Sequence, residues 1–209
     1  MVDDIIIRKS SMAFLFGTDL ESNKNRIDIK LAADKAYGDM ARHTLNLKEK
    51  GKRNVLKDAA MEMIFDSIQI KEKTRLTSSE YDKWHKDTCD ELKRIYANQV
   101  VNSTGTLTYG QAQKWLNMTV KYLFYIYSLY QFDEIDGDFF KHAHVPLDSI
   151  MYSIIETELH IDKPKTSWSK TDDYGEYLKY QNYIRRAILD FEYFDQPISP
   201  LEWEMLNWK

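Results

Sequence analysis

Residues 110–130, GQAQKWLNMTVKYLFYIYSLY, are the most informative part of this chain for its architecture. Apolar side chains occupy most faces of the helix that this stretch predicts, whereas a surface helix has a single apolar stripe. Such a helix needs partners on all of its sides. We therefore expect residues 110–130 to form the central, buried helix, with the rest of the chain packed around it.

Helical periodicity also runs through most of the remaining sequence. Six further helices are expected, over residues 27–47, 55–70, 80–101, 146–159, 171–194 and 201–208. Their starts carry residues that cap or begin helices, namely Ser78 or Ser79, Pro146, Thr171–Asp173 and Ser199-Pro200. A strand pair is expected, if anywhere, within residues 3–16. The predicted fold is all-α, one compact domain over residues 1–209 with two lobes.

The composition narrows the class of protein. A chain of 209 residues, 43% of them hydrophobic and 13% aromatic, can bury a core and is too aromatic to be disordered. Seven Gly and four Pro are too few for the many turns of a β-sandwich or barrel. The single cysteine, Cys89, excludes a disulfide framework and a cysteine-ligated cluster. No apolar run approaches the ~20 residues of a membrane span, so we expect a soluble, cytoplasmic protein.

The histidines do not predict a metal site. The chain has five of them, His43, His85, His142, His144 and His160. No two have the four-residue spacing, with a carboxylate between them, of a helical metal site. His142 and His144 share a predicted loop, where histidines are usually solvated. We therefore expect no metal and no cofactor.

The most informative segment for chemistry is Leu107-Thr-Tyr-Gly-Gln-Ala-Gln-Lys114, at the start of the central helix. The first backbone N–H groups of a helix lack partners within it, and the small Gly110 and Ala112 would let a phosphate approach them. The positive end of the helix dipole also disfavours an ammonium at Lys114, as a lysine nucleophile requires. An ordinary surface lysine is the alternative interpretation.

A second segment is His144-Val-Pro-Leu-Asp148, where Pro146 marks a helix start and Asp148 is expected in the first turn. A carboxylate there is stabilised by the helix dipole. A fixed, ionised carboxylate can stabilise the oxocarbenium-like transition state of glycosidic bond cleavage. Its alternative role is to improve helix capping.

Together the two segments resemble the helix-hairpin-helix DNA glycosylase superfamily, and most closely its archaeal 8-oxoguanine glycosylase branch. The family pattern runs Gly-x-Gly-x-Lys and later Pro-x-Asp; here Ala112 replaces the second Gly, and Thr108-Tyr109 stands where Pro-Gly is usual. The central helix of that branch also carries a second lysine, as Lys121 does here. The resemblance covers residues 107–155, and residues 102–155 would form the hairpin and catalytic segment.

The resemblance implies roles for these residues. Lys114 would be the Schiff-base nucleophile and Asp148 the catalytic carboxylate. The DNA-binding residues would be Gly110, Gln111, Ala112 and Gln113. An extruded base would be held by stacking, for which we single out Trp168 and Trp208 because both lie outside the predicted helices or at their ends. The implied partner is double-stranded DNA carrying a damaged or modified base, bound by a monomer.

The charge distribution permits such a partner. The net charge of −4, from 29 Lys+Arg against 33 Asp+Glu, argues weakly against a nucleic-acid binder. The basic residues nevertheless gather in two places: Lys48, Lys50, Lys52, Arg53 and Lys57, and then Lys163, Lys165 and Lys170. An acidic protein can thus present a local basic face. The alternative function is a non-catalytic all-α interaction protein of a mobile element or phage-defence system, favoured by the acidic C-terminal segment and the abundant tyrosines.

Overall fold

The computed structural model describes residues 10–17, 27–71, 74–130, 138–189, 192–193 and 196–208. Its helices are α2 (Ile27–Ala41), α3 (Arg53–Lys71), α4 (Ser78–Ile95), α5 (Tyr109–Tyr130), α6 (Asp138–Lys141), α7 (Ser149–Leu159), α8 (Tyr174–Ala187) and α9 (Pro200–Asn207). The structure also contains two short 3-10 helices, η1 (Lys50–Lys52) and η2 (Trp168–Lys170). The predicted all-α class is confirmed.

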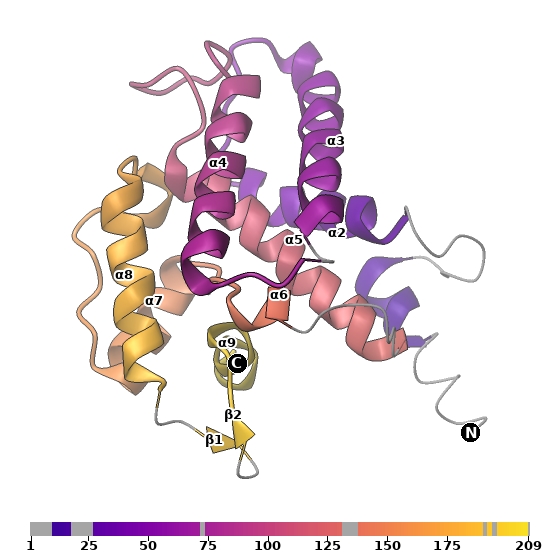
Figure 1. Ribbon diagram of the computed structural model, residues 1–209. Helices are drawn as coiled ribbons and strands as arrows, with labels where there is room; N and C mark the ends of the chain where they lie inside the picture. The colour runs from indigo at the N-terminus through magenta and orange to yellow at the C-terminus, as the bar shows by residue number, and fades with distance from the viewer. Residues whose placement is uncertain are drawn as a thin grey trace.

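The helix α5 runs through the middle of the molecule (Figure 1). It packs against α2, α4, η2 and α8. Every residue from Gln111 to Lys121 is buried, including six polar ones. The apolar surface all round the helix is therefore covered, as the sequence predicted.

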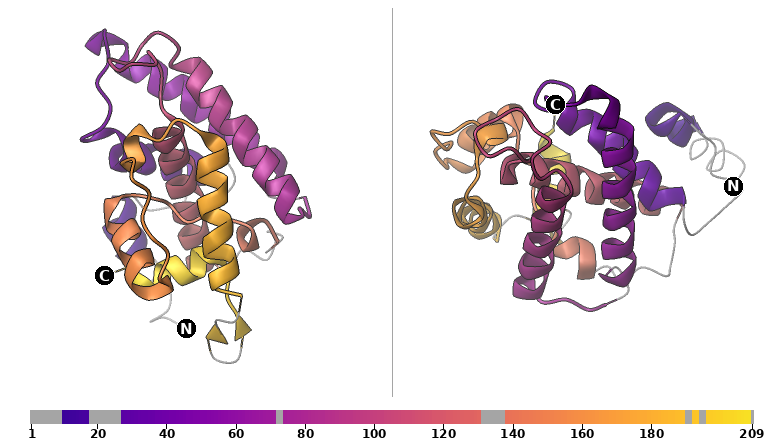
Figure 2. Two further views of the ribbon diagram at one scale, coloured as in Figure 1. Left: turned by 90° about the vertical axis from the view of Figure 1, so that its left-hand side faces the viewer. Right: turned by 90° about the horizontal axis from the view of Figure 1, so that it is seen from above.

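The other helices form layers around α5 (Figures 1 and 2). The antiparallel helices α3 and α4 contact each other, and α7 and α8 do so beside the N-terminal half of α5. The buried apolar residues fall into two clusters. The larger cluster is built mainly from the five helices α2 through α6. The smaller cluster is built mainly from the 145–155 segment and α8.

Several helix ends differ from the sequence predictions. The helix α2 ends at Ala41 because the following chain becomes extended and pairs with the turn after α4: Lys48 N donates to Gln99 O (2.8 Å) and Val101 N to Asn46 O (2.8 Å). The helix α4 is capped by Thr77, in a reciprocal capping box with Glu80, and not by Ser78 or Ser79. For α8 and α9, the predicted caps Asp173 and Ser199 are confirmed.

The only strands among the described residues are β1 (Glu192–Tyr193) and β2 (Gln196–Pro197), an antiparallel pair near the C-terminus. Residues 10–16 are helical, so the strand pair expected within 3–16 is wrong there; residues 3–9 lie outside the described part of the chain. None of the described helices combines the length and apolar character needed to cross a membrane.

Candidate active site

The two residues singled out for chemistry lie side by side. Lys114, in the second turn of α5, places Nζ 2.7 Å from Oδ2 of Asp148, which lies 34 residues later in the chain. Their side chains are 6% and 16% exposed. Asp148 is the N-cap of α7 rather than a first-turn residue: its Oδ1 accepts a hydrogen bond from Met151 N (2.8 Å). One carboxylate oxygen therefore holds the helix while the other faces the lysine.

This ion pair borders a cleft of about 490 Å³. The size falls within the range of small-molecule sites, roughly 300–1,000 Å³. Helices α2, α5, α7 and α9 and the 10–16 segment all contribute side chains to it. The lining residues are Leu15, Asp39, Arg42, His43, Lys114, Met118, Lys121, Tyr122, Tyr125, Asp148, Ile150, Glu204 and Trp208. The cleft thus combines two lysines, three carboxylates and three aromatic rings.

Trp208, immediately after α9, also lines this cleft. Its ring centre lies 6.0 Å from Lys114 Nζ and 5.0 Å from Lys121 Nζ. The residue is 41% exposed, although it belongs to a cleft with two buried cations. An aromatic face beside cations attracts them electrostatically and also offers a surface on which a planar group can stack.

A second ion pair lies deeper in the same cleft. Lys121 Nζ is 2.7 Å from the Glu204 carboxylate, and both side chains are almost completely buried. Burial raises the pKa of Glu204 above its ordinary value, and the Lys121 ammonium opposes that rise. Glu204 belongs to the acidic C-terminal segment, which in the sequence analysis favoured the alternative, non-catalytic function. The available signal was the seven-residue spacing from Lys114 to Lys121, two helical turns, which puts both lysines on one face.

Comparisons with models of known protein families, with curated proteins and with solved structures found no match.

The four residues expected to contact DNA do not reach the surface. Gly110, Gln111, Ala112 and Gln113 are all buried. The N–H groups expected to be free are also occupied, because Gly110 N donates to Thr171 O (2.8 Å) and the next two N–H groups donate to Thr108. The expectation of an outward-facing helix start is wrong because the segment around η2 covers it.

Gly110 has a packing role instead. A Cβ at this position would lie 1.6 Å from the carbonyl oxygen of Trp168. The absent side chain thus allows the backbone of η2 to lie directly on the start of α5. Trp168 itself packs against the smaller hydrophobic cluster and does not line the 490 Å³ cleft.

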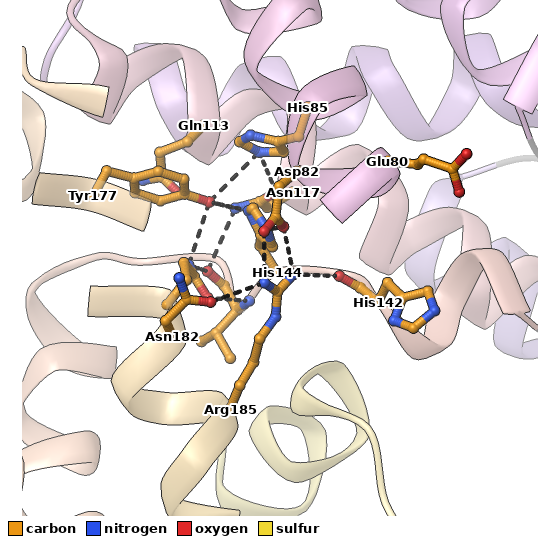
Figure 3. Close-up of polar contacts among 12 residues, drawn as sticks. Glu80, Asp82, His85, Gln113, Asn117, His142, His144, Tyr177, Asn182 and Arg185 are labelled. Carbon is orange, nitrogen blue, oxygen red and sulfur yellow. Dashed lines mark hydrogen bonds and ion pairs between the residues drawn. The ribbon is translucent and has the colours of Figure 1, made fainter. Parts of the chain in front are cut away.

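The loop histidine His144 is also not solvated as predicted. It is buried, with Nε2 2.8 Å from Asp82 Oδ1 and Nδ1 2.8 Å from the Tyr177 hydroxyl (Figure 3). Arg185 binds the same Asp82 carboxylate through two nitrogens, at 2.9 and 2.7 Å. Burial lowers the pKa of His144 to about 4, while the Asp82 hydrogen bond opposes that change. Among the described residues, no group of three or more His, Cys, Asp or Glu is arranged to hold a metal.

Another cavity, of about 590 Å³, lies between α6, α8 and the start of α9. Its lining is mostly apolar, and Arg185, one of its charged residues, is already paired with Asp82. The predicted basic regions are partly neutralised as well: Lys52, Lys57 and Lys163 each form an ion pair with an acidic side chain. The 490 Å³ cleft is therefore the better candidate for chemistry.

Proposed function

We propose that this protein is a DNA glycosylase, with abasic-site lyase activity, that excises a damaged or modified base through an imine at Lys114. The observation that carries the proposal is the 2.7 Å contact between the Lys114 amine and the Asp148 carboxylate at one cleft. A nucleophile adjacent to a fixed carboxylate, both at the edge of a pocket, is the arrangement that covalent glycosidic cleavage requires.

The first step needs a neutral lysine. The Asp148 carboxylate is within hydrogen-bond distance and can accept the proton that Lys114 releases. The proton passes to Asp148 only as the amine attacks, so the carboxylate is still ionised while positive charge develops on the sugar of the target nucleotide, and it stabilises that charge. The amine of Lys114 then attacks C1′, the glycosidic bond breaks, and its electron pair leaves with the base, which takes up the proton.

The sugar ring then opens to an imine between Lys114 and C1′. Water can hydrolyse this imine, which regenerates the amine and leaves an abasic site. Alternatively, a proton is lost from C2′ and the 3′ phosphate departs, which breaks the strand. Because the target atom is inaccessible within a duplex, the nucleotide has to be flipped into the cleft, where Trp208 offers a stacking surface.

The residues do not favour one base over another. An oxidised purine follows from the branch that the sequence resembles, and a hypermodified phage base is its rival. The test is therefore a panel of duplexes carrying oxidised, alkylated, deaminated and hypermodified bases, assayed for base release. Release from one class, lost in Lys114→Gln, supports the proposal. No release from any duplex, together with no salt-dependent DNA binding, contradicts it and favours a non-catalytic interaction protein.

A further inference from the structure

The segment that leads to Asp148 is extended and completely buried. Residues 143–147 belong to no helix or strand, and all five are buried. An extended chain without a neighbouring strand leaves its backbone N–H and C=O groups to be satisfied by other means. Two glutamine side chains perform that function here.

Gln113, on α5, binds both backbone polar groups of Leu147. Its Nε2 donates to Leu147 O (3.1 Å), and its Oε1 accepts from Leu147 N (3.4 Å). Its remaining capacity is also used, because Nε2 donates to Gly110 O (2.9 Å) and Oε1 accepts from Asn117 Nδ2 (3.0 Å). The amide therefore makes the four hydrogen bonds that it can form, which fixes its position.

Gln181, on α8, makes the same contact two residues earlier. Its Nε2 donates to Val145 O (2.8 Å), and its Oε1 accepts from Val145 N (3.1 Å). Alternate residues of an extended chain are thus each paired with one primary amide, much as they would pair with a neighbouring strand. Pro146, between them, has its φ fixed by its ring.

The two ends of this arrangement are the proposed reactive residues. Gln113 immediately precedes Lys114, and Leu147 immediately precedes Asp148. The bond between Gln113 and Leu147 therefore joins the backbones next to the two groups whose atoms lie 2.7 Å apart. Catalysis of this kind depends on positioning within fractions of an ångström.

We propose that Gln113 is a positioning residue, which sets the Asp148 carboxylate against the Lys114 amine by holding Leu147. A polar network holds the Gln113 amide in place, because its partner Asn117 also contacts His85 Nε2 (2.9 Å) and the Tyr177 hydroxyl (2.9 Å) (Figure 3). Gln113 touches no part of the cleft and acts only through its neighbours. The role rests on the proposed glycosylase chemistry.

The test replaces each glutamine by methionine, which has a similar length and no amide. Gln113→Met should lower the single-turnover excision rate by about 10-fold to 100-fold, the effect of a small misplacement, and leave DNA affinity unchanged. Gln181→Met is the matched control, because it removes the corresponding two bonds to Val145, farther from Asp148, together with a bond from Nε2 to the Tyr177 hydroxyl (3.3 Å). It should lower the melting temperature comparably and the excision rate much less.

A second readout does not depend on activity. The Met151 amide is held by Asp148, so its hydrogen exchange reports whether the carboxylate is in place. Gln113→Met should raise that exchange by about 5-fold to 10-fold, the fold-change that corresponds to the net contribution of one hydrogen bond, and Gln181→Met should not. If the unsubstituted protein excises no base, the proposed function fails, and this exchange still decides whether Gln113 positions Asp148.

Three results would overturn the inference. One is an unchanged excision rate in Gln113→Met, and another is an equal loss of rate in Gln181→Met. The third is unchanged exchange at Met151. Should Gln113→Met not fold, Gln113→Glu keeps the shape and, with its buried carboxyl group protonated, has one donor in place of two, and the same outcomes apply to it.

Discussion

The carboxylate of Asp148 is shared between the start of α7 and the side chain of Lys114, with one oxygen 2.8 Å from Met151 N and the other 2.7 Å from Lys114 Nζ. The carboxylate is therefore fixed by a helix end and is not free to follow the lysine. Such a group can stabilise charge without reorganising during the reaction.

The first prediction concerns the charge of Asp148. Asp148→Asn keeps a good N-cap for α7 but leaves the Lys114 ammonium, whose side chain is 6% exposed, without its carboxylate, so stability should fall by about 1–3 kcal/mol. Base release should nevertheless be abolished, because the amide neither stabilises positive charge nor accepts the lysine proton. Release and DNA affinity are measured on the same duplex, and affinity should stay near that of the unsubstituted protein. Normal release by Asp148→Asn would exclude the proposed role.

The second prediction concerns the close approach at Gly110. Gly110→Ala puts a Cβ against the backbone of Trp168 and should cost about 1–3 kcal/mol or more in unfolding free energy. Gly38→Ala is the matched control, because Gly38 lies within α2 and an added Cβ meets nothing within 4 Å. That variant should be stabilised by about 0.5–1 kcal/mol. Denaturant unfolding measures both; equal effects would contradict the packing described for η2.

The third prediction concerns the buried ion pair. Glu204→Gln leaves the Lys121 ammonium buried without a carboxylate and should cost about 3–5 kcal/mol. The double variant Lys121→Met/Glu204→Leu should recover most of that loss, since no charge is then left in the interior. The exposed pair of Lys83 and Asp87 serves as the control, and Asp87→Asn should change stability by no more than about 1 kcal/mol. A similarly small effect of Glu204→Gln would mean that water reaches the buried pair.

The fourth prediction concerns pH and stability. The pKa of His144 is about 4 in the folded protein, against 6.5 when exposed, because burial disfavours its cation. Burial also lowers the pKa of His85. The unfolded chain therefore binds more protons between pH 6.5 and 4, so folding stability is lost as the pH falls through that window. His144 alone contributes about 3 kcal/mol of this loss.

Denaturant unfolding at several pH values measures how steeply the free energy of unfolding changes with pH, and this slope checks the prediction. It should become shallower in His144→Gln. It should persist in His160→Asn, because His160 is exposed and has a φ of 56°, which asparagine tolerates. An unchanged slope in His144→Gln would show that other groups cause the acid sensitivity.

The hydrophobic periodicity of the sequence predicted the position of the central helix but not the burial of its polar residues. The apolar pattern of residues 110–130 was sufficient to place α5 at the centre, because an all-round apolar helix has no other stable position. The same pattern could not show that Gln113 and Asn117 are buried, because a polar side chain on a helix can just as well be exposed to water. Their burial depends on partners that arrive from residues far away in the chain.

At the candidate site, too, local sequence patterns predicted some features, whereas others depend on residues far away in the chain. Two short motifs indicated Lys114 and Asp148. The segment that packs on Gly110 is η2, which lies about 60 residues later in the chain, and no local sequence pattern predicts this contact. The second ion pair was missed for a similar reason. Glu204 is 83 residues from Lys121, and acidic side chains are usually solvated.

The most direct measurement is reductive trapping followed by mapping of the modified lysine. The protein is incubated with borohydride and a duplex carrying an abasic site or a base released in the panel, and the adduct is digested for peptide mass spectrometry. We predict a covalent adduct on Lys114, absent in Lys114→Gln and present in Lys121→Gln. An adduct on Lys121, or no adduct with DNA that the protein binds, would contradict the assignment of Lys114 as the nucleophile.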